Sequence, residues 1–221
     1  RTAIAILDKV PLLPDSIQRL LEWTSRYYHC PLGEVFANAL PNSLRVGKDF
    51  KNSLKKSPKI HAAKINSKKI VINTTTDGAL AKIIQLNTHQ QQAIATIINS
   101  LGKFQAFLLN GVTGSGKTEV YLEAIQAVLD RGEQALVLVP EIGLTPQMLE
   151  RFQARFSVPL LLFHSRLTEK QRLEHWLLSK TGAASIIIGT RSALFTPLLR
   201  PGIIIVDEEH DHSYKQTEKN P

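Results

Sequence analysis

One stretch of eight residues has the composition of a phosphate-binding loop. It matches the pattern G-x-x-x-x-G-K-[S/T] at every position, with the residues Gly111, Val112, Thr113, Gly114, Ser115, Gly116, Lys117 and Thr118. Glycines let several backbone N–H groups converge on one anion, because a Cβ would block that approach. The Lys117 ammonium suits the β- and γ-phosphates, and the Thr118 hydroxyl suits Mg²⁺. The loop therefore predicts a nucleoside-triphosphate site with Lys117 as a catalytic residue.

Two adjacent carboxylates follow an apolar run near the other end of the chain. Residues 203–206 are Ile-Ile-Ile-Val, and Asp207 and Glu208 come next. A carboxylate at the tip of a buried strand is the expected second Mg²⁺ ligand, so we assign that role to Asp207. We expect Glu208 to polarise the water that attacks the γ-phosphate, and His210 to sense the state of the nucleotide. Two acids with separate duties indicate hydrolysis, whereas a kinase would need a second substrate pocket.

Five short apolar runs alternate with amphipathic stretches in the second part of the chain. They cover residues 107–109, 135–139, 159–163, 185–188 and 203–206. Runs that are apolar along their whole length are typical of strands covered on both faces, as in a parallel sheet flanked by helices. The clearest helix follows the loop and ends at Gly132. These patterns predict an α/β fold of the P-loop NTPase class, with run 107–109 as the strand that enters the loop.

The first 44 residues predict a small helical unit. A helix-start signal at Pro14-Asp15-Ser16 precedes apolar residues at helical spacing, and a second such pattern stops at Pro41. We assign the aromatic residues Trp23, Tyr27 and Tyr28 to the core of this unit, with base stacking as the alternative.

The net charge of the chain is concentrated in one segment. The 221 residues carry a net charge of +8, and all of it lies within residues 1–85. Most of the excess comes from a basic segment between Arg45 and Lys69 that includes Lys55 and Lys56. This distribution predicts a polyanion partner such as nucleic acid, and a solvated linker is the alternative.

The composition excludes several classes of protein. With 43% hydrophobic and 21% charged residues, the chain is neither collagen, coiled coil nor wholly disordered. No apolar run approaches the roughly 20 residues that span a bilayer, so we predict no membrane partner. The single cysteine, Cys30, excludes an internal disulfide and a zinc site built from several cysteines of this chain.

Four stretches carry a resemblance to a known family. Asp207-Glu208-Glu209-His210 is a DExH (DEAH-type) box, and residues 85–221 resemble the first, RecA-like motor lobe of a superfamily 2 helicase. Residues 111–121, 138–147, 189–195 and 207–216 are similar, in that order, to motifs of the bacterial primosomal helicases that restart stalled replication forks. Residues 27–35 resemble the end of the N-terminal DNA-binding domain of that family.

The resemblance implies ATP- and Mg²⁺-dependent, 3′-to-5′ unwinding of DNA in replication restart and primosome assembly. It implies single-stranded and forked DNA, other primosome proteins and single-strand-binding protein as partners, in the bacterial cytoplasm with the nucleoid. Gln90 matches the adenine-reading segment of such motors. The residues that match their single-strand channel are Pro140, Glu141, Thr190, Arg191 and Ser192. For Arg191, a structural ion pair is the alternative.

The chain also departs from the pattern of that family. We expect residues 1–46 to be the end of the N-terminal DNA-binding domain, 47–84 a basic linker or winged-helix remnant, and 85–221 the first motor lobe, truncated. The second motor lobe, its arginine finger and the cysteines of the zinc-binding insertion of that family are absent from the sequence. The first residue is Arg1 rather than Met. We therefore expect a piece of a longer protein that by itself binds ATP poorly and unwinds nothing.

Two other functions remain open at this point. One is another nucleic-acid motor of the same superfamily, such as a restriction translocase or an RNA helicase. The other is a P-loop enzyme that is not a motor, such as a kinase, for which Glu208 would be dispensable.

Overall fold

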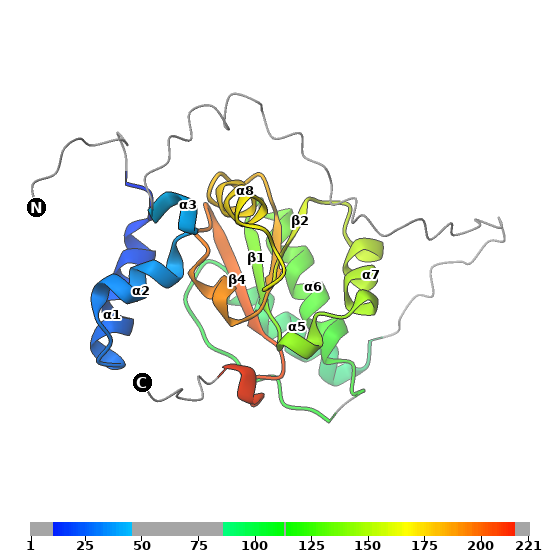
Figure 1. Ribbon diagram of the computed structural model, residues 1–221. Helices are drawn as coiled ribbons and strands as arrows, with labels where there is room; N and C mark the ends of the chain where they lie inside the picture. Colours follow the sequence, from blue (N-terminus) through cyan, green and yellow to red (C-terminus); the bar gives the residue numbers. More distant parts are fainter. Residues whose placement is uncertain (1–10, 46–85, 113, 215–221) are drawn as a thin grey trace, which may run out of the picture.

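The computed structural model describes residues 11–45, 86–112 and 114–214 (Figure 1). Its centre is a parallel sheet of four strands in the order β2-β3-β1-β4. The strands are β1 (Gln134–Leu138), β2 (Leu160–Phe163), β3 (Ile186–Gly189) and β4 (Pro201–Val206). Four of the five predicted strands are therefore present, and the predicted fold class is confirmed.

Helices cover both faces of this sheet. On one face, α6 (Lys117–Asp130) and α7 (Pro146–Arg155) pack on β1 and β3, and α5 (Thr88–Asn99) contacts α6. On the other face lie α8 (Glu169–Lys180) and the 3-10 helix η2 (Arg191–Phe195) (Figure 1). Because β1 and β3 are covered on both sides, they are buried along their whole length, and their residues after Gln134 are apolar, as the sequence pattern predicted.

The register makes all four strands end at one level. Leu138 of β1 pairs with Gly189 of β3 and with Val206 of β4, and Phe163 of β2 pairs with the same Gly189. The segments that follow the strands therefore emerge at one edge of the sheet. These segments include the 3-10 helices η1 (Glu141–Gly143), η2 and η3 (His212–Tyr214).

The predicted strand at 107–109 is wrong. Phe107, Leu108 and Leu109 lie outside the sheet, and no backbone hydrogen bond joins them to β4 among the described residues. Leu108 is 78% exposed. On β4, Ile204 is 53% exposed and Val206 is 46% exposed. Three apolar residues provide few ladder hydrogen bonds, so such a short run does not by itself pair with an edge strand.

The N-terminal residues form the two predicted helices, α1 (Asp15–Tyr27) and α2 (Leu32–Ala39), and a short third one, α3 (Asn42–Arg45). They do not form a core of their own. Leu21 of α1 and Val35 and Ala39 of α2 share one apolar cluster with Trp176 of α8. Phe195 of η2 packs against the same cluster. The helical unit is therefore attached to the face of the sheet that α8 and η2 cover (Figure 1).

The assignment of Trp23, Tyr27 and Tyr28 to the core is also wrong. These rings are 53%, 62% and 66% exposed. Trp23 stacks on Tyr27 with 4.8 Å between the ring centroids, and Tyr27 meets Tyr28 edge-on. Trp23 lies two residues after the buried Leu21, which places it about 200° around the helix and on the opposite face.

One buried polar side chain connects the start of the sheet to two loops. The amide nitrogen of Gln134 donates hydrogen bonds to the carbonyls of Ser179 (3.1 Å) and Ala184 (2.6 Å). Its amide oxygen accepts from the backbone N–H groups of Leu199 (2.7 Å) and Arg200 (3.1 Å). Gln134 is 3% exposed, so water cannot replace these bonds.

Replacing Gln134 by Leu removes four hydrogen bonds between the start of the sheet and the segments around Ser179, Ala184 and Arg200. We expect the free energy of unfolding to fall by about 2 kcal/mol or more, since each lost hydrogen bond costs roughly 0.5–1.5 kcal/mol. Urea denaturation measures this, with Gln153→Leu on the exposed side of α7 as the control. Equal losses in the two variants would contradict the role of Gln134.

Candidate functional site

The loop between residues 111 and 118 has the backbone of an anion-binding turn. Gly114 and Gly116 have φ of 80° and 83°, a region that favours glycine, and α6 begins directly after Gly116. The Lys117 ammonium donates hydrogen bonds to the carbonyls of Gly111 (2.6 Å) and Val112 (3.4 Å). A positive charge and the positive end of a 14-residue helix thus meet at the loop.

Gln90 lies against this loop. Its amide nitrogen donates a hydrogen bond to the Ser115 carbonyl at 3.1 Å. Its amide oxygen accepts from the N–H of Asn87, while the Asn87 side chain accepts from the N–H of Gln90, which forms a capping box at the start of α5. A Cβ on Gly116 would collide with the Gln90 amide. Gln90 therefore ties the segment upstream of the loop to the loop itself.

Asp207 lies at the tip of β4, and its neighbours connect it with the loop. The Tyr121 hydroxyl donates a hydrogen bond to the Thr118 hydroxyl oxygen at 3.4 Å, and it also helps to lower the pKa of the Asp207 carboxylate. The charge of Lys117 also acts on Asp207. The structure thus brings Lys117, Thr118 and Asp207 near one another, although Thr118 and Asp207 are 89 positions apart in the sequence.

Sequence reasoning placed Tyr121 only on the apolar face of a helix. Its signal was its spacing, because a residue three positions after Thr118 lies on the same side of α6. Burial, together with the nearby Asp207 carboxylate, raises the pKa of Tyr121 to about 12. The hydroxyl therefore keeps its proton at neutral pH and donates it to the hydroxyl oxygen of Thr118.

The surroundings of Asp207 disfavour the ionised form of its carboxyl group. Burial and the adjacent Glu208 carboxylate raise its pKa above the ordinary value of 3.8. The backbone N–H of Glu208, the Lys117 ammonium and the Tyr121 hydroxyl act in the opposite direction and are outweighed. A divalent cation beside the carboxylate would favour its ionised form.

Glu208 occupies a strained turn directly after β4. Its φ is 48°, a left-handed value that side chains with a Cβ rarely adopt and that costs about 1–3 kcal/mol. Its carboxylate is 3.5 Å from the imidazole Nε2 of His210. Both side chains are exposed, at 45% and 75%. The turn therefore places the Glu208 carboxylate beside the His210 imidazole, directly after Asp207 in the chain.

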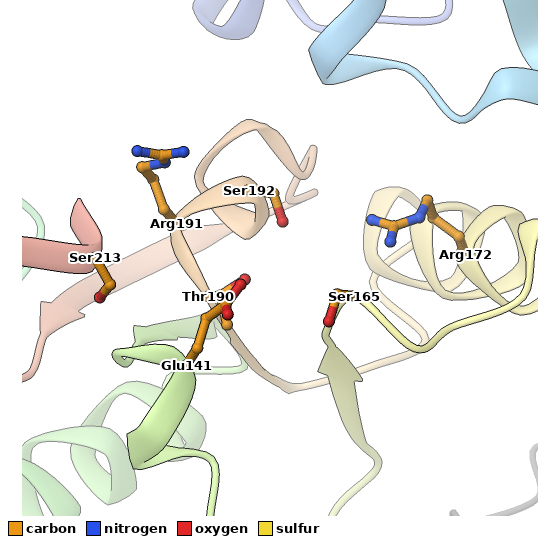
Figure 2. A pocket seen from close by; sticks show the side chains of 7 residues that line it. All are labelled: Glu141, Ser165, Arg172, Thr190, Arg191, Ser192 and Ser213. Carbon is orange, nitrogen blue, oxygen red and sulfur yellow. The ribbon is translucent and has the colours of Figure 1, made fainter. Parts of the chain in front are cut away.

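A second group of predicted residues lies farther along the same edge (Figure 2). Glu141, Thr190, Arg191 and Ser192, which match the single-strand channel of the family, line one hollow. Ser165, Arg172 and Ser213 line it as well and were missed. Their types are too common in proteins for the sequence to single them out. Pro140, which also matches the single-strand channel of the family, is buried and directly precedes η1.

Three predicted site residues lie outside the described part of the chain. They are Thr113 of the loop and Lys55 and Lys56 of the basic segment. Among the described residues, no cluster of three or more His, Cys, Asp or Glu side chains is arranged to hold a metal ion. A hydroxyl and one carboxylate nevertheless fit Mg²⁺, which usually takes its other ligands from phosphates and water. No described helix is both long enough and apolar enough to cross a membrane.

Comparison with known proteins places this arrangement in a family. The sequence model of DEAD/DEAH box helicases matches residues 87–220. A second model, the 3′DNA-binding domain (3′BD) of PriA, matches residues 1–41. The chain is 36% identical over 267 aligned positions to the replication restart protein PriA of Haemophilus influenzae, and the alignment covers 95% of this chain. The chain belongs to the PriA proteins of the DEAD/DEAH box helicase family. The resemblance inferred from the four sequence stretches is thereby confirmed.

Two other PriA proteins have a higher sequence identity to this chain over a shorter alignment. Identity is 50% over 137 residues with the Synechocystis protein and 44% over 137 residues with the Bacillus subtilis protein. These alignments cover 62% and 61% of this chain and 16% and 17% of the relatives. The Haemophilus alignment covers 36% of its relative, so the chain spans about a third, at most, of the length of these three proteins.

The opposite pKa shifts of two aspartates predict opposite effects on stability. Asp207→Asn removes a charge that the fold disfavours, so we expect a higher melting temperature at pH 7. Asp211 has its pKa lowered by the N–H of Ser213, 2.7 Å from its carboxylate, so Asp211→Asn should lower the melting temperature at pH 7.

Melting curves from pH 3 to pH 8 check both signs. The Asp207 difference should appear as the pH rises through the raised pKa, and the Asp211 difference should disappear as the pH falls through the lowered one. A melting temperature of Asp207→Asn below that of the wild type at pH 7 would contradict this account.

Proposed function

We propose that this chain is the ATP-binding part of a replication-restart helicase that moves 3′-to-5′ along DNA. The observation that supports this most directly is the position of Asp207, whose pKa is affected by Lys117 and by Tyr121, while the Tyr121 hydroxyl donates a hydrogen bond to Thr118. It supports a single site formed by the phosphate loop and the carboxylate of β4. The membership of the chain in the PriA proteins, named for replication restart, supports DNA as the track.

Each residue of this site has a separate task in the proposal. The backbone N–H groups of residues 111–118 and the Lys117 ammonium bind the β- and γ-phosphates. Thr118 and Asp207 hold Mg²⁺, which when bound neutralises phosphate charge. Glu208 accepts a proton from the attacking water, and His210 couples that carboxylate to the state of the nucleotide. Gln90 reads the adenine edge, exchanging its bond to Ser115 for one to the base.

The proposal assigns the neighbouring part of the edge to DNA. Glu141, Thr190, Arg191 and Ser192 line the path of a single strand, and the basic segment with Lys55 and Lys56 adds unspecific attraction to phosphates. By likeness to the relatives, the substrate is forked DNA and the partners are primosome proteins and single-strand-binding protein. The protein acts in the bacterial cytoplasm, at the nucleoid.

The proposed organisation follows from the coverage of the relatives. Since the chain spans about a third of the Haemophilus protein, we propose that it is one part of a longer helicase. Residues 1–46 belong to its DNA-binding domain, 47–84 form a basic connection, and 85–221 belong to the first motor lobe. A second lobe with its arginine finger and a zinc-binding insertion lie in the rest of that protein.

Lys117→Ala tests the nucleotide site in the chain itself. We expect the affinity for ATP–Mg²⁺ to fall at least tenfold, because a hydrogen bond to a charged group contributes roughly 1.5–3 kcal/mol. The melting temperature without nucleotide should stay close to that of the wild type. Calorimetric titration and thermal shift measure the two effects, with the exposed Lys103→Ala as the control. Equal thermal shifts with ATP in Lys117→Ala and the wild type would overturn the assignment.

Glu208→Gln tests hydrolysis in the whole protein. Loss of the general base should lower the rate of DNA-stimulated ATP hydrolysis by about 10²–10⁴-fold and leave ATP binding intact. Glu209→Gln changes the same functional group one residue later and should keep the rate of the wild type. Forked and single-stranded DNA should raise that rate, and RNA should not. A rate that does not respond to DNA, or a fully active Glu208→Gln variant, contradicts the proposed function.

A further inference from the structure

The peptide group between Asp207 and Glu208 interacts with its surroundings through both of its polar atoms. Its carbonyl oxygen, which belongs to Asp207, accepts a hydrogen bond from the Tyr214 hydroxyl at 2.9 Å. Its N–H, which belongs to Glu208, acts on the Asp207 carboxylate and lowers the pKa of that group. Because the C=O and N–H of a trans peptide point in opposite directions, a single orientation of the peptide plane serves both interactions.

The same orientation produces the backbone strain of Glu208. The φ of Glu208 is 48°, and this angle describes the rotation between the peptide and the Cα atom of Glu208. Turning the peptide over by about 180° would carry φ from the left-handed region into the extended region, which every residue adopts easily. The observed orientation is thus the less favourable one for a residue with a Cβ, so contacts with the surroundings must select it.

The sheet holds only the first side of this turn. The N–H of Asp207 donates a hydrogen bond to the Leu138 carbonyl at 2.9 Å, which continues the pairing of β4 with β1 by one residue. The next peptide lies beyond the sheet. Among the residues that the structure describes, the Tyr214 hydroxyl is the one hydrogen-bond donor to the Asp207 carbonyl.

Tyr214 is itself well anchored. It belongs to η3, which Figure 1 shows in red next to the end of β4, and it packs against the apolar cluster that contains Leu138 and Ala193. The N–H of Asp211 donates to the Glu208 carbonyl at 2.9 Å, and the N–H of Tyr214 donates to the Asp211 carbonyl at 3.2 Å. These bonds turn the chain back after Glu208, so that the hydroxyl meets the tip of β4.

The Tyr214 hydroxyl remains a donor at neutral pH. Burial raises the pKa of Tyr214, and the nearby carboxylates of Asp207, Asp211 and Glu208 raise it further. The hydroxyl therefore holds the carbonyl as a neutral group and does not exchange protons in the reaction.

We propose that Tyr214 is a positioning residue for ATP hydrolysis, which holds the peptide between Asp207 and Glu208 in the orientation that the reaction requires. This rests on the proposed function, in which Asp207 holds Mg²⁺ and Glu208 accepts a proton from the attacking water. Without the hydroxyl, the strain at Glu208 favours turning the peptide over, and the Glu208 carboxylate then leaves its working direction. Lys117 and the phosphate loop keep their own contacts, so nucleotide binding remains.

Tyr214→Phe in the whole protein tests this contact, because it removes the hydroxyl and keeps the ring in the apolar cluster. We expect kcat of ATP hydrolysis to fall about two- to tenfold, the factor that corresponds to the net contribution of one neutral hydrogen bond. KM for ATP should stay at the wild-type value, and so should the DNA concentration that gives half of the maximal rate. The fall in kcat should be the same with and without DNA, since the contact lies within the ATP site.

Two control variants separate positioning from stability. Tyr28→Phe makes the same chemical change at an exposed tyrosine and should keep the wild-type kcat. Gln134→Leu destabilises the opposite end of the sheet and should keep kcat despite a lower melting temperature. A fall in kcat that follows the melting temperature in Tyr214→Phe and Gln134→Leu alike would show a merely structural role and overturn the inference.

NMR spectra of the 221-residue chain report on the peptide itself. The amide signal of Glu208 and the coupling constant between its H–N and Hα protons depend on φ. We expect both to change in Tyr214→Phe and to stay unchanged in Tyr28→Phe. Unchanged Glu208 signals in Tyr214→Phe, or a wild-type kcat in that variant, overturns the inference. An extended φ of Glu208 in the wild-type chain overturns it without any variant.

Failure of this inference can be told from failure of the proposed function. If DNA-stimulated hydrolysis depends on Glu208 and Tyr214→Phe keeps the wild-type kcat, the inference alone fails. If the whole protein does not hydrolyse ATP in response to DNA, the proposed function fails, and the role of Tyr214 in that reaction fails with it. The Glu208 signals then still decide whether Tyr214 holds the peptide.

Discussion

The common level at which the four parallel strands end is the constraint on which the rest of the structure depends. Leu138, Gly189 and Val206 are in register across three strands, and Phe163 of the fourth pairs with Gly189. Whatever follows each strand therefore meets at one edge. Gly189 shows how tightly this edge is built, because a Cβ there would lie 2.6 Å from that of Ala193 and 2.8 Å from that of Phe163. Only glycine lets η2 fold back over the end of β3 and carry Thr190 and Arg191 to the hollow.

The edge contains groups whose placement costs stability. Burial raises the pKa of the Asp207 carboxylate, and the next residue, Glu208, has a left-handed backbone conformation. The apolar layers on the two faces of the sheet and the buried bonds of Gln134 oppose these costs. Strain and desolvation confined to one turn, in a well-packed scaffold, are typical of a site whose ligand restores the balance.

The N-terminal helices pack against two elements that form this edge of the sheet. They pack on Trp176 of α8 and Phe195 of η2, and those two elements also carry Arg172 and Arg191. A smaller hollow, lined by Leu40 and Pro41 as well as Arg172 and Ser192, lies between this helical unit and the edge. A shift of the helical unit would therefore displace the arginines of the larger hollow, since packed elements move together.

Periodicity and spacing alone predicted the positions of several elements, because these signals are local in the sequence. The elements are the four strands, the helices α1, α2 and α6, the phosphate loop and the carboxylates at the end of β4. Three things were decided by the tertiary structure. Residues 107–109 look like a strand but found no partner, since strand formation depends on a neighbour and not only on composition. Trp23, Tyr27 and Tyr28 look like core but are exposed, because the side of a helix that is buried depends on what packs against it. Tyr121 and Arg172 look ordinary in the sequence, and only the folding of distant segments to one edge places the first beside Asp207 and the second opposite Arg191.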